Sequence, residues 1–162
     1  MRRLLPAMLI LPLLAASGRA DPAGRGQPQG QPQAPPRWQA TSNTALSITG
    51  DITVTADRIT FAGGHSLSLS QPTPLPRFQA EGSPVAATRY RVANPTDPLL
   101  LNSNRLCGGN RPVPVTYIVL WKAKRFGADA DPRGLAVFSG TAPPTGTDSP
   151  GLCGTFRYEA GR

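Results

Sequence analysis

The sequence predicts an all-β fold: a small antiparallel β-barrel or β-sandwich of about seven or eight short strands with one disulfide, preceded by a signal peptide and a disordered Pro/Gln-rich tether. Three observations support this prediction. Apolar residues recur with a period of two from residue 45 onward, and Gly, Pro and Asp separate the short apolar runs. After the N-terminal region, no segment shows helical periodicity over a convincing length.

The first predicted strands form a meander in which polar and apolar residues alternate. The four segments are ALSIT (45–49), ITVT (52–55), RITF (58–61) and HSLSLS (65–70). Gly63-Gly64, between the last two, favours a type I′ turn. We expect one face of this meander to be buried and the other to carry hydroxyl groups.

The second half of the chain alternates strands with long connections. Gln71 to Pro84 is rich in proline, which sheet interiors exclude, so it predicts a loop. The segment TRYRV (88–92) predicts a strand with a basic outer face. VPVTYIVLW (113–121) is apolar at nearly every position and predicts a strand buried on both faces. Two further strands are expected at 135–138 and 153–158.

The N-terminus has the organisation of an export signal. Arg2 and Arg3 precede an apolar run from Leu4 to Leu14, and small residues lead to a predicted cleavage site after Ala20. Eleven residues in a helix span about 16 Å, well short of a hydrocarbon core of about 30 Å. We therefore predict a signal peptide at 1–20, a disordered Pro/Gln/Gly-rich linker at 21–37 and a β-domain at 38–160. The mature form, without a transmembrane span, is expected to be periplasmic or secreted.

The charge predicts a mild preference for anionic surfaces. The whole chain carries a formal net charge of +8 from 17 basic and 9 acidic residues. Removal of Arg2, Arg3 and Arg19 with the signal leaves 14 basic against 9 acidic residues, a net charge of +5. The expected partners are an anionic envelope polymer or an acidic protein. An exported address excludes nucleic acid.

Five basic side chains form a candidate anion-binding patch if their strands are neighbours. They are Arg89, Arg91, Lys122, Lys124 and Arg125. Solvated strand faces and loop ends also carry such charges routinely, which is the alternative interpretation.

The two cysteines, Cys107 and Cys153, predict a disulfide. Exported proteins form disulfides readily, and the two residues are 46 positions apart in the chain. Closing a loop of that length stabilises a fold by about 4 kcal/mol in the chain-entropy model. A nucleophilic cysteine with the single histidine, His65, is the alternative. A zinc site would need paired ligands at short spacing, which are absent from this sequence.

The sequence favours a protein that is not an enzyme, without metal or cofactor. Asp129 and Asp131 in GADADPRG suggest a calcium loop, but the further acids and the distal Glu of such a loop are missing, and an Asx turn beside Pro132 is the preferred interpretation. No nucleophile elbow, zinc-protease helix or phosphate-binding glycine loop is present in the sequence. No catalytic residue is predicted.

The strand rhythm from Trp38 to Tyr158 resembles the small meander barrels of lipocalin-like and avidin-like exported proteins. In addition, SPVAATRYRV (83–92) is similar to a Ser- and Tyr-containing loop in one family of periplasmic lysozyme inhibitors. The chain departs from that family in charge, because a +5 inhibitor would meet basic lysozymes with like charge. The first functional expectation is a non-enzymatic exported binding domain for an envelope ligand or protein partner. The alternatives are a structural envelope component and a periplasmic inhibitor of a hydrolase such as lysozyme.

Overall fold

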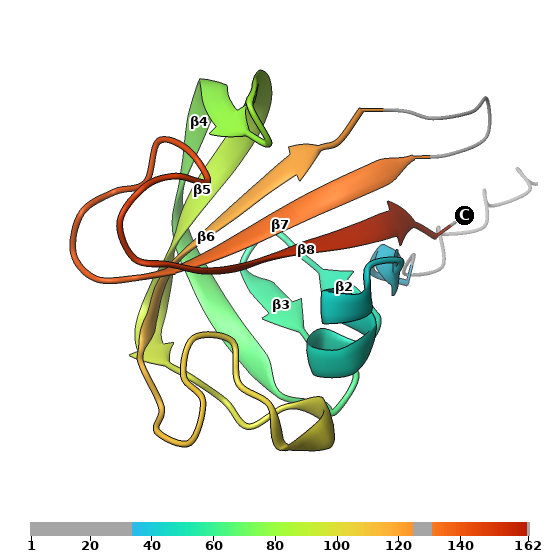
Figure 1. The fold of residues 1–162 in the computed structure, drawn as a ribbon. Helices are drawn as coiled ribbons and strands as arrows, with labels where there is room; N and C mark the ends of the chain where they lie inside the picture. Colours follow the sequence, from blue (N-terminus) through green and yellow to red (C-terminus); the bar gives the residue numbers. More distant parts are fainter. Residues whose placement is uncertain (1–33, 125–130, 162) are drawn as a thin grey trace, which may run out of the picture. The chain divides into compact units, whose positions relative to one another are not determined.

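The structure, a computed structural model, describes residues 34–124 and 131–161, and they form a closed antiparallel β-barrel (Figure 1). The strands are β1 (Arg37–Ala40), β2 (Ile52–Val54), β3 (Arg58–Thr60), β4 (Ser66–Ala80), β5 (Ser83–Thr96), β6 (Val115–Lys122), β7 (Pro132–Ser139) and β8 (Leu152–Ala160). Each strand pairs with the next, and β1 pairs with β8 to close the sheet. The all-β prediction is confirmed, and the choice between barrel and sandwich is resolved as a barrel. The predicted signal peptide lies outside the described residues, as does the linker up to residue 33.

An antiparallel meander brings alternate connections to opposite ends of the barrel. The connections after β1, β3, β5 and β7 lie at one end, which we call the closed end. The connections after β2 and β4 lie at the other end, together with the starts of β1 and β7 and the ends of β6 and β8. In the part of the chain that the structure describes, no helix is long and apolar enough to cross a membrane.

The strand β6 is buried on both faces, as predicted. Ile118 and Leu120 belong to the core inside the barrel, to which every strand contributes. Tyr117, Val119 and Trp121 point to the opposite face and form a second apolar cluster on the outer wall. This cluster also contains Phe78, Ala80, Ala136 and Phe138, all buried.

The end of the β4–β5 hairpin covers this outer cluster. Phe78 packs against Trp121 with ring centroids 5.7 Å apart. The backbone of Gln79 is bonded to the β7–β8 connection, accepting from the N–H of Thr147 at 2.8 Å and donating to the carbonyl of Thr145 at 3.1 Å. The wall therefore has a second layer on one side, which explains why β6 and β7 lack polar outer faces.

The segment predicted as the first strand, ALSIT, is wrong as a strand: it forms a single π-helical turn, η1 (Ala45–Thr49). The turn places Ala45 and Thr49 in the core and leaves Leu46 55% exposed, whereas a strand would bury Leu46. Local polar groups explain the difference. The Ser42 hydroxyl accepts from the N–H of Ala45 at 3.2 Å, and the Thr49 hydroxyl donates to the Ala45 carbonyl at 3.1 Å.

The prediction of a loop from Gln71 to Pro84 is also wrong, because nearly all of that segment belongs to β4 and β5, which have 15 and 14 residues and are not short. The strand β3 pairs only with residues 66–68, so the rest of β4 has β5 as its sole strand neighbour. Two irregularities, between Ser70 and Thr73 and between Leu75 and Phe78, absorb extra residues. Prolines are tolerated at such bulges and on an edge.

The type I′ turn occurs at a different hairpin from the one predicted. At Gly63-Gly64 only Gly64 has positive φ, 82°, so the β3–β4 turn is of another type. The β4–β5 hairpin instead turns through Glu81 and Gly82, with φ of 52° and 75°, between the paired residues Ala80 and Ser83. Both values are those a type I′ turn requires.

Candidate functional site

The end of the barrel that bears the β2–β3 connection, the end of β6 and the start of β7 is hollow, and we call this hollow the barrel mouth. It has a volume of about 340 Å³, within the range of about 300–1,000 Å³ that is usual for small-molecule sites. The side chains that determine its chemistry are Trp38, Val54, Tyr90, Leu120, Lys122 and Arg133. They come from β1, β2, β5, β6 and β7, so the mouth is built on strands.

The strand period explains why two cations lie at this apolar opening. Lys122 follows Ile118 and Leu120 at intervals of two on the inner face of β6. Arg133 precedes Leu135 and Val137 at the same interval on β7, and Arg133 pairs with Lys122 across the two strands. In both β6 and β7, the inward-facing position nearest the mouth is therefore basic.

Arg133 is the least exposed cation of the mouth. Its guanidinium carbon lies 5.6 Å from the centre of the Trp38 ring, a cation–π contact. One of its terminal nitrogens donates to Asp131. Its Nε–H is buried and has no hydrogen-bond acceptor among the described residues. The guanidinium is therefore held against the Trp38 ring, with its Nε–H unpaired within the described ranges.

Asp131 is the carboxylate that both cations of the mouth share. Besides its bond to Arg133, it lies 4.0 Å from the Lys122 ammonium, in an ion pair whose lysine side chain is 71% exposed. Among the described residues of the rim, two positive charges thus share one negative charge. Asp131, considered above for calcium, is thus engaged by cations, and Asp129 lies outside the described residues. Within the described ranges, no group of three or more His, Cys, Asp or Glu side chains is arranged to hold a metal ion.

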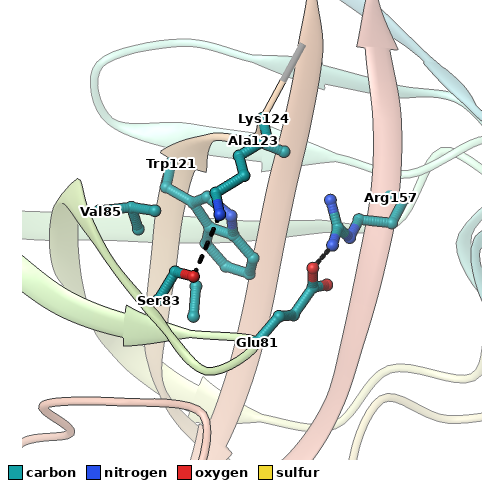
Figure 2. A pocket seen from close by; sticks show the side chains of 8 residues that line it. Glu81, Ser83, Val85, Trp121, Ala123, Lys124 and Arg157 are labelled. Atoms are coloured by element: carbon teal, nitrogen blue, oxygen red, sulfur yellow. Dashed lines mark hydrogen bonds and ion pairs between the residues drawn. The ribbon is translucent and has the colours of Figure 1, made fainter. Parts of the chain in front are cut away.

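A second hollow lies under the β4–β5 hairpin on the outer wall (Figure 2). Its volume is about 90 Å³, too small for a ligand of ordinary size. Glu81 forms an ion pair with Arg157, and the Lys124 ammonium donates to the Ser83 hydroxyl at 3.2 Å. Burial lowers the pKa of Arg157. These contacts hold the hairpin against the barrel wall. We therefore interpret this hollow as a packing void beneath the hairpin and not as a ligand site.

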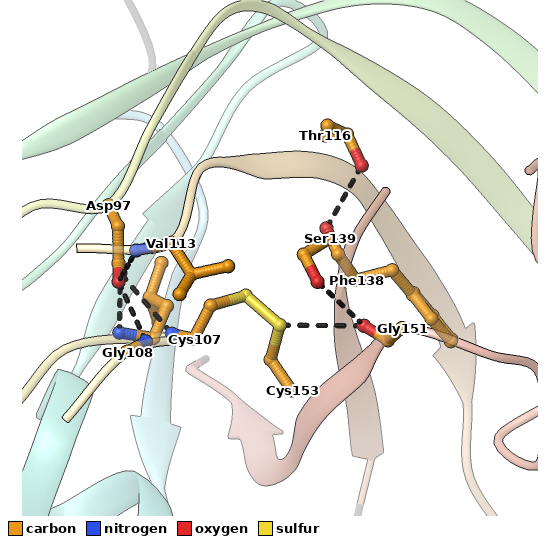
Figure 3. The surroundings of a disulfide bond; sticks show 10 residues. Asp97, Cys107, Gly108, Val113, Thr116, Phe138, Ser139, Gly151 and Cys153 are labelled. Atoms are coloured by element: carbon orange, nitrogen blue, oxygen red, sulfur yellow. Dashed lines mark hydrogen bonds between the residues drawn. A yellow bond between two sulfur atoms is a disulfide. The ribbon is translucent and has the colours of Figure 1, made fainter. Parts of the chain in front are cut away.

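The closed end carries the disulfide between Cys107 and Cys153, which confirms the predicted bridge, with Cα atoms 4.6 Å apart (Figure 3). Beside it, the buried carboxylate of Asp97 accepts four backbone N–H groups. The donors are Leu106 at 2.9 Å, Cys107 at 3.2 Å, Gly108 at 2.8 Å and Val113 at 3.0 Å. One aspartate thus organises the long β5–β6 connection.

A third hollow, of about 370 Å³, lies against this connection and the disulfide. Most of its wall is the loop from Ser103 to Asn110. Part of that loop is already committed to internal bonds, because Asn104 donates to the Ser47 carbonyl at 3.2 Å and Asp97 holds the loop amides. The mouth has aromatic walls and two cations that can donate hydrogen bonds to a ligand. It is therefore a better candidate for a ligand site than the third hollow.

The alternative of a cysteine nucleophile is not supported by the geometry. Neither cysteine is free, because both form the disulfide. His65 is exposed at the β3–β4 turn, where the N–H of Phe61 donates to its backbone carbonyl at 2.9 Å. His65 thus belongs to a turn, the interpretation that its position beside Gly63-Gly64 indicated.

The structure distributes the described residues of the predicted anion-binding patch among three places. Arg89 and Arg91 lie on the outer wall, 6.0 and 5.8 Å from the centre of the Tyr117 ring. Lys122 lines the mouth, and Lys124 lies under the hairpin. Arg125 lies outside the described residues. The two arginines form a pair around one aromatic ring, and an anion site at this pair remains a prediction.

A buried hydroxyl pair lies inside the barrel beneath the mouth. The Tyr158 and Thr49 hydroxyl oxygens are 2.7 Å apart, and the Tyr158 ring lies 6.1 Å from that of Trp38. Burial raises the pKa of the Tyr158 phenol. The pair joins η1 to β8 and stays protonated at neutral pH, so its role is structural.

Comparison of the chain with protein-family models, curated proteins and solved structures gave no match. The segment similar to a lysozyme-inhibitor loop lies along β5, where Tyr90 packs against the core inside the barrel.

Proposed function

We propose that this chain is a non-enzymatic, exported binding protein that holds a small envelope molecule in the barrel mouth. The observation that carries the proposal is the mouth itself: an opening of ligand size whose walls include Trp38, Tyr90 and Leu120. An apolar hollow built on strands is the usual form of a small-molecule site in a β-barrel. The predicted export signal and the disulfide support an envelope location.

The experiment is titration with N-phenyl-1-naphthylamine, a neutral probe whose fluorescence rises in apolar surroundings. We expect saturable binding of one probe per chain. Replacing Ala86, an exposed residue that lines the mouth, by Trp should abolish this binding because the indole would occupy the hollow. The matched control is Ala93→Trp, on an exposed position of the same strand outside the mouth. Equal probe binding by both variants would exclude the mouth as the site.

A native mass spectrum of protein isolated from its own envelope gives the second measurement. A mass above that of the chain, released on denaturation, would be the bound molecule. Full cleavage after Ala20 would show in the same spectrum and would support export. A signal peptide still attached would contradict that part of the proposal.

A further inference from the structure

We infer that the molecule bound in the barrel mouth is an amphipathic anion, whose acidic head group binds to Arg133 and Lys122 in place of Asp131. This inference rests on the proposed function, since it assigns a ligand class to the same site. The shared chemistry is an apolar or aromatic body with one sulfonate, carboxylate or phosphate group.

The position of Arg133 is the first step of the argument. A ligand entering the mouth meets the Trp38 ring and, against that ring, the guanidinium. Arginine presents five N–H donors in a planar fork that matches the oxygens of an acidic group. In the structure, one terminal nitrogen of Arg133 donates to Asp131, and the side chain is 21% exposed, so an acidic group in the mouth can reach the guanidinium. An anion with two or three oxygens can accept from more of the terminal N–H groups than the contact with Asp131 uses.

The charge balance at the rim is the second step. Lys122 and Arg133 oppose the single carboxylate of Asp131, whose side chain is 44% exposed and reachable from solvent. Lys122 lies at the ion-pair limit of 4.0 Å from Asp131, so it contributes little to that pair and can turn toward a ligand. An incoming anion therefore replaces one carboxylate and neutralises the excess charge. A neutral ligand would leave the excess charge in place, and a cationic ligand would increase it.

The apolar wall is the third step. Val54 and Leu120 lie below the cations, and their side chains are among the buried core residues. A ligand with an acidic head group and an apolar body fits this arrangement, because the head group would contact the cations at the rim and the body would contact the apolar wall. An anion without an apolar body would use the rim alone and would compete with solvent.

Two probes that differ by one group test this inference. N-phenyl-1-naphthylamine is neutral, and 1-anilinonaphthalene-8-sulfonate has the same rings with a sulfonate. We expect the wild-type protein to bind the sulfonate probe on the order of tenfold more tightly, as expected for a charge-assisted interaction in a partly buried site. Equal affinities for the two probes would refute the inference and leave the proposed function intact. Binding of neither probe would refute the proposed function.

Variants of the three charged residues identify the group that makes the difference. Arg133→Gln and Lys122→Gln should each weaken the sulfonate probe severalfold more than they weaken the neutral probe. The matched control is Arg58→Gln, which removes an exposed arginine from the outer face of β3. If Arg58→Gln weakens the sulfonate probe equally, net charge is responsible and the inference fails.

Asp131→Asn predicts a gain for the sulfonate probe alone, whereas misfolding would expose apolar surface and increase the binding of both probes. Removing the competing carboxylate should tighten the sulfonate probe severalfold, without changing the affinity for the neutral probe. An unchanged or weaker affinity for the sulfonate in a folded Asp131→Asn protein would show that Asp131 is not the group that the ligand replaces.

Discussion

Replacement of Asp97 by Asn should destabilise the closed end of the barrel far more than any exposed aspartate does. The two carboxylate oxygens each accept two backbone N–H groups, one pair from Leu106 and Cys107 and the other from Gly108 and Val113. An asparagine can keep one pair on its amide oxygen. Its NH₂ group would face the other pair, donor against donor.

The magnitude follows from the two N–H groups that lose their acceptor. A buried donor left without an acceptor costs about 1–3 kcal/mol, and hydrogen bonds to a charged acceptor are stronger than neutral ones. Two such donors give an expected loss of about 3 kcal/mol in the free energy of unfolding, with Asp97 itself only 3% exposed. That loss is a large fraction of the stability of a small domain.

Urea unfolding followed by tryptophan fluorescence, with the disulfide intact, measures this change. The control is Asp57→Asn, the same substitution at an exposed turn, where the carboxylate accepts from the Thr55 hydroxyl at 2.8 Å and from no other described side chain or amide. We expect a change within about 0.5 kcal/mol for the control. A loss below about 1 kcal/mol for Asp97→Asn would mean that water replaces the carboxylate and that the loop does not depend on it.

Three further predictions concern the disulfide, the buried phenol and the arginine pair. The Cys107→Ser, Cys153→Ser double variant should lose about 4 kcal/mol of unfolding free energy, the loop-closure value for 46 residues, measured by urea unfolding; a loss below about 1 kcal/mol would contradict this account. Because the pKa of Tyr158 is raised on folding, its stabilising contribution is complete below about pH 10 and is lost as the pH rises further. Urea unfolding at a series of alkaline pH values should therefore show a shallower decline for Tyr158→Phe, by up to about 1.4 kcal/mol per pH unit, and equal slopes would contradict the assignment. The Arg89→Gln, Arg91→Gln double variant should elute from heparin at lower salt than the wild type if the pair around Tyr117 binds anions.

The control for the arginine pair is a double variant with the same net charge. Arg58→Gln, Arg77→Gln removes two exposed arginines from β3 and β4. A larger shift for the Arg89 and Arg91 variant would support a local site. Equal shifts would show that only total charge matters, and the anion-site hypothesis would then fail.

Strands with a simple two-residue period could be predicted from the sequence. Segments whose backbone conformation depends on pairing with distant residues could not. Residues 115–121 of VPVTYIVLW belong to a strand with buried residues on both faces, as predicted, whereas Val113 lies outside the strand and is 40% exposed. The proline-rich segment from Gln71 was misassigned because proline is excluded from the interior of a sheet but not from its edge. This part of β4 is an edge because β3 ends before it, which the sequence does not indicate. ALSIT was misassigned because its alternation also fits a turn held by Ser42 and Thr49.

The candidate site was missed for a related reason. The predicted strand at 135–138 begins after Arg133, yet Arg133 shares the two-residue period with Leu135 and Val137, so the signal was available. Extending the inner face of 135–138 backwards by one step would have placed Arg133 at the barrel opening. Asp97 carried no such signal, since its four donors come from residues 9 to 16 positions away in an irregular loop.

The disulfide and the Asp97 network lie at the end of the barrel opposite the candidate ligand site. The Cys107–Cys153 disulfide and the Asp97 network hold the closed end. The mouth has an apolar wall and a rim whose charged side chains are partly exposed, Lys122 most of all. Substitutions at the rim should therefore change binding with little effect on unfolding, whereas substitutions at the closed end should do the reverse. A Lys122→Gln protein that unfolded as readily as Asp97→Asn would contradict this separation, because it would mean that the rim charges hold the fold together.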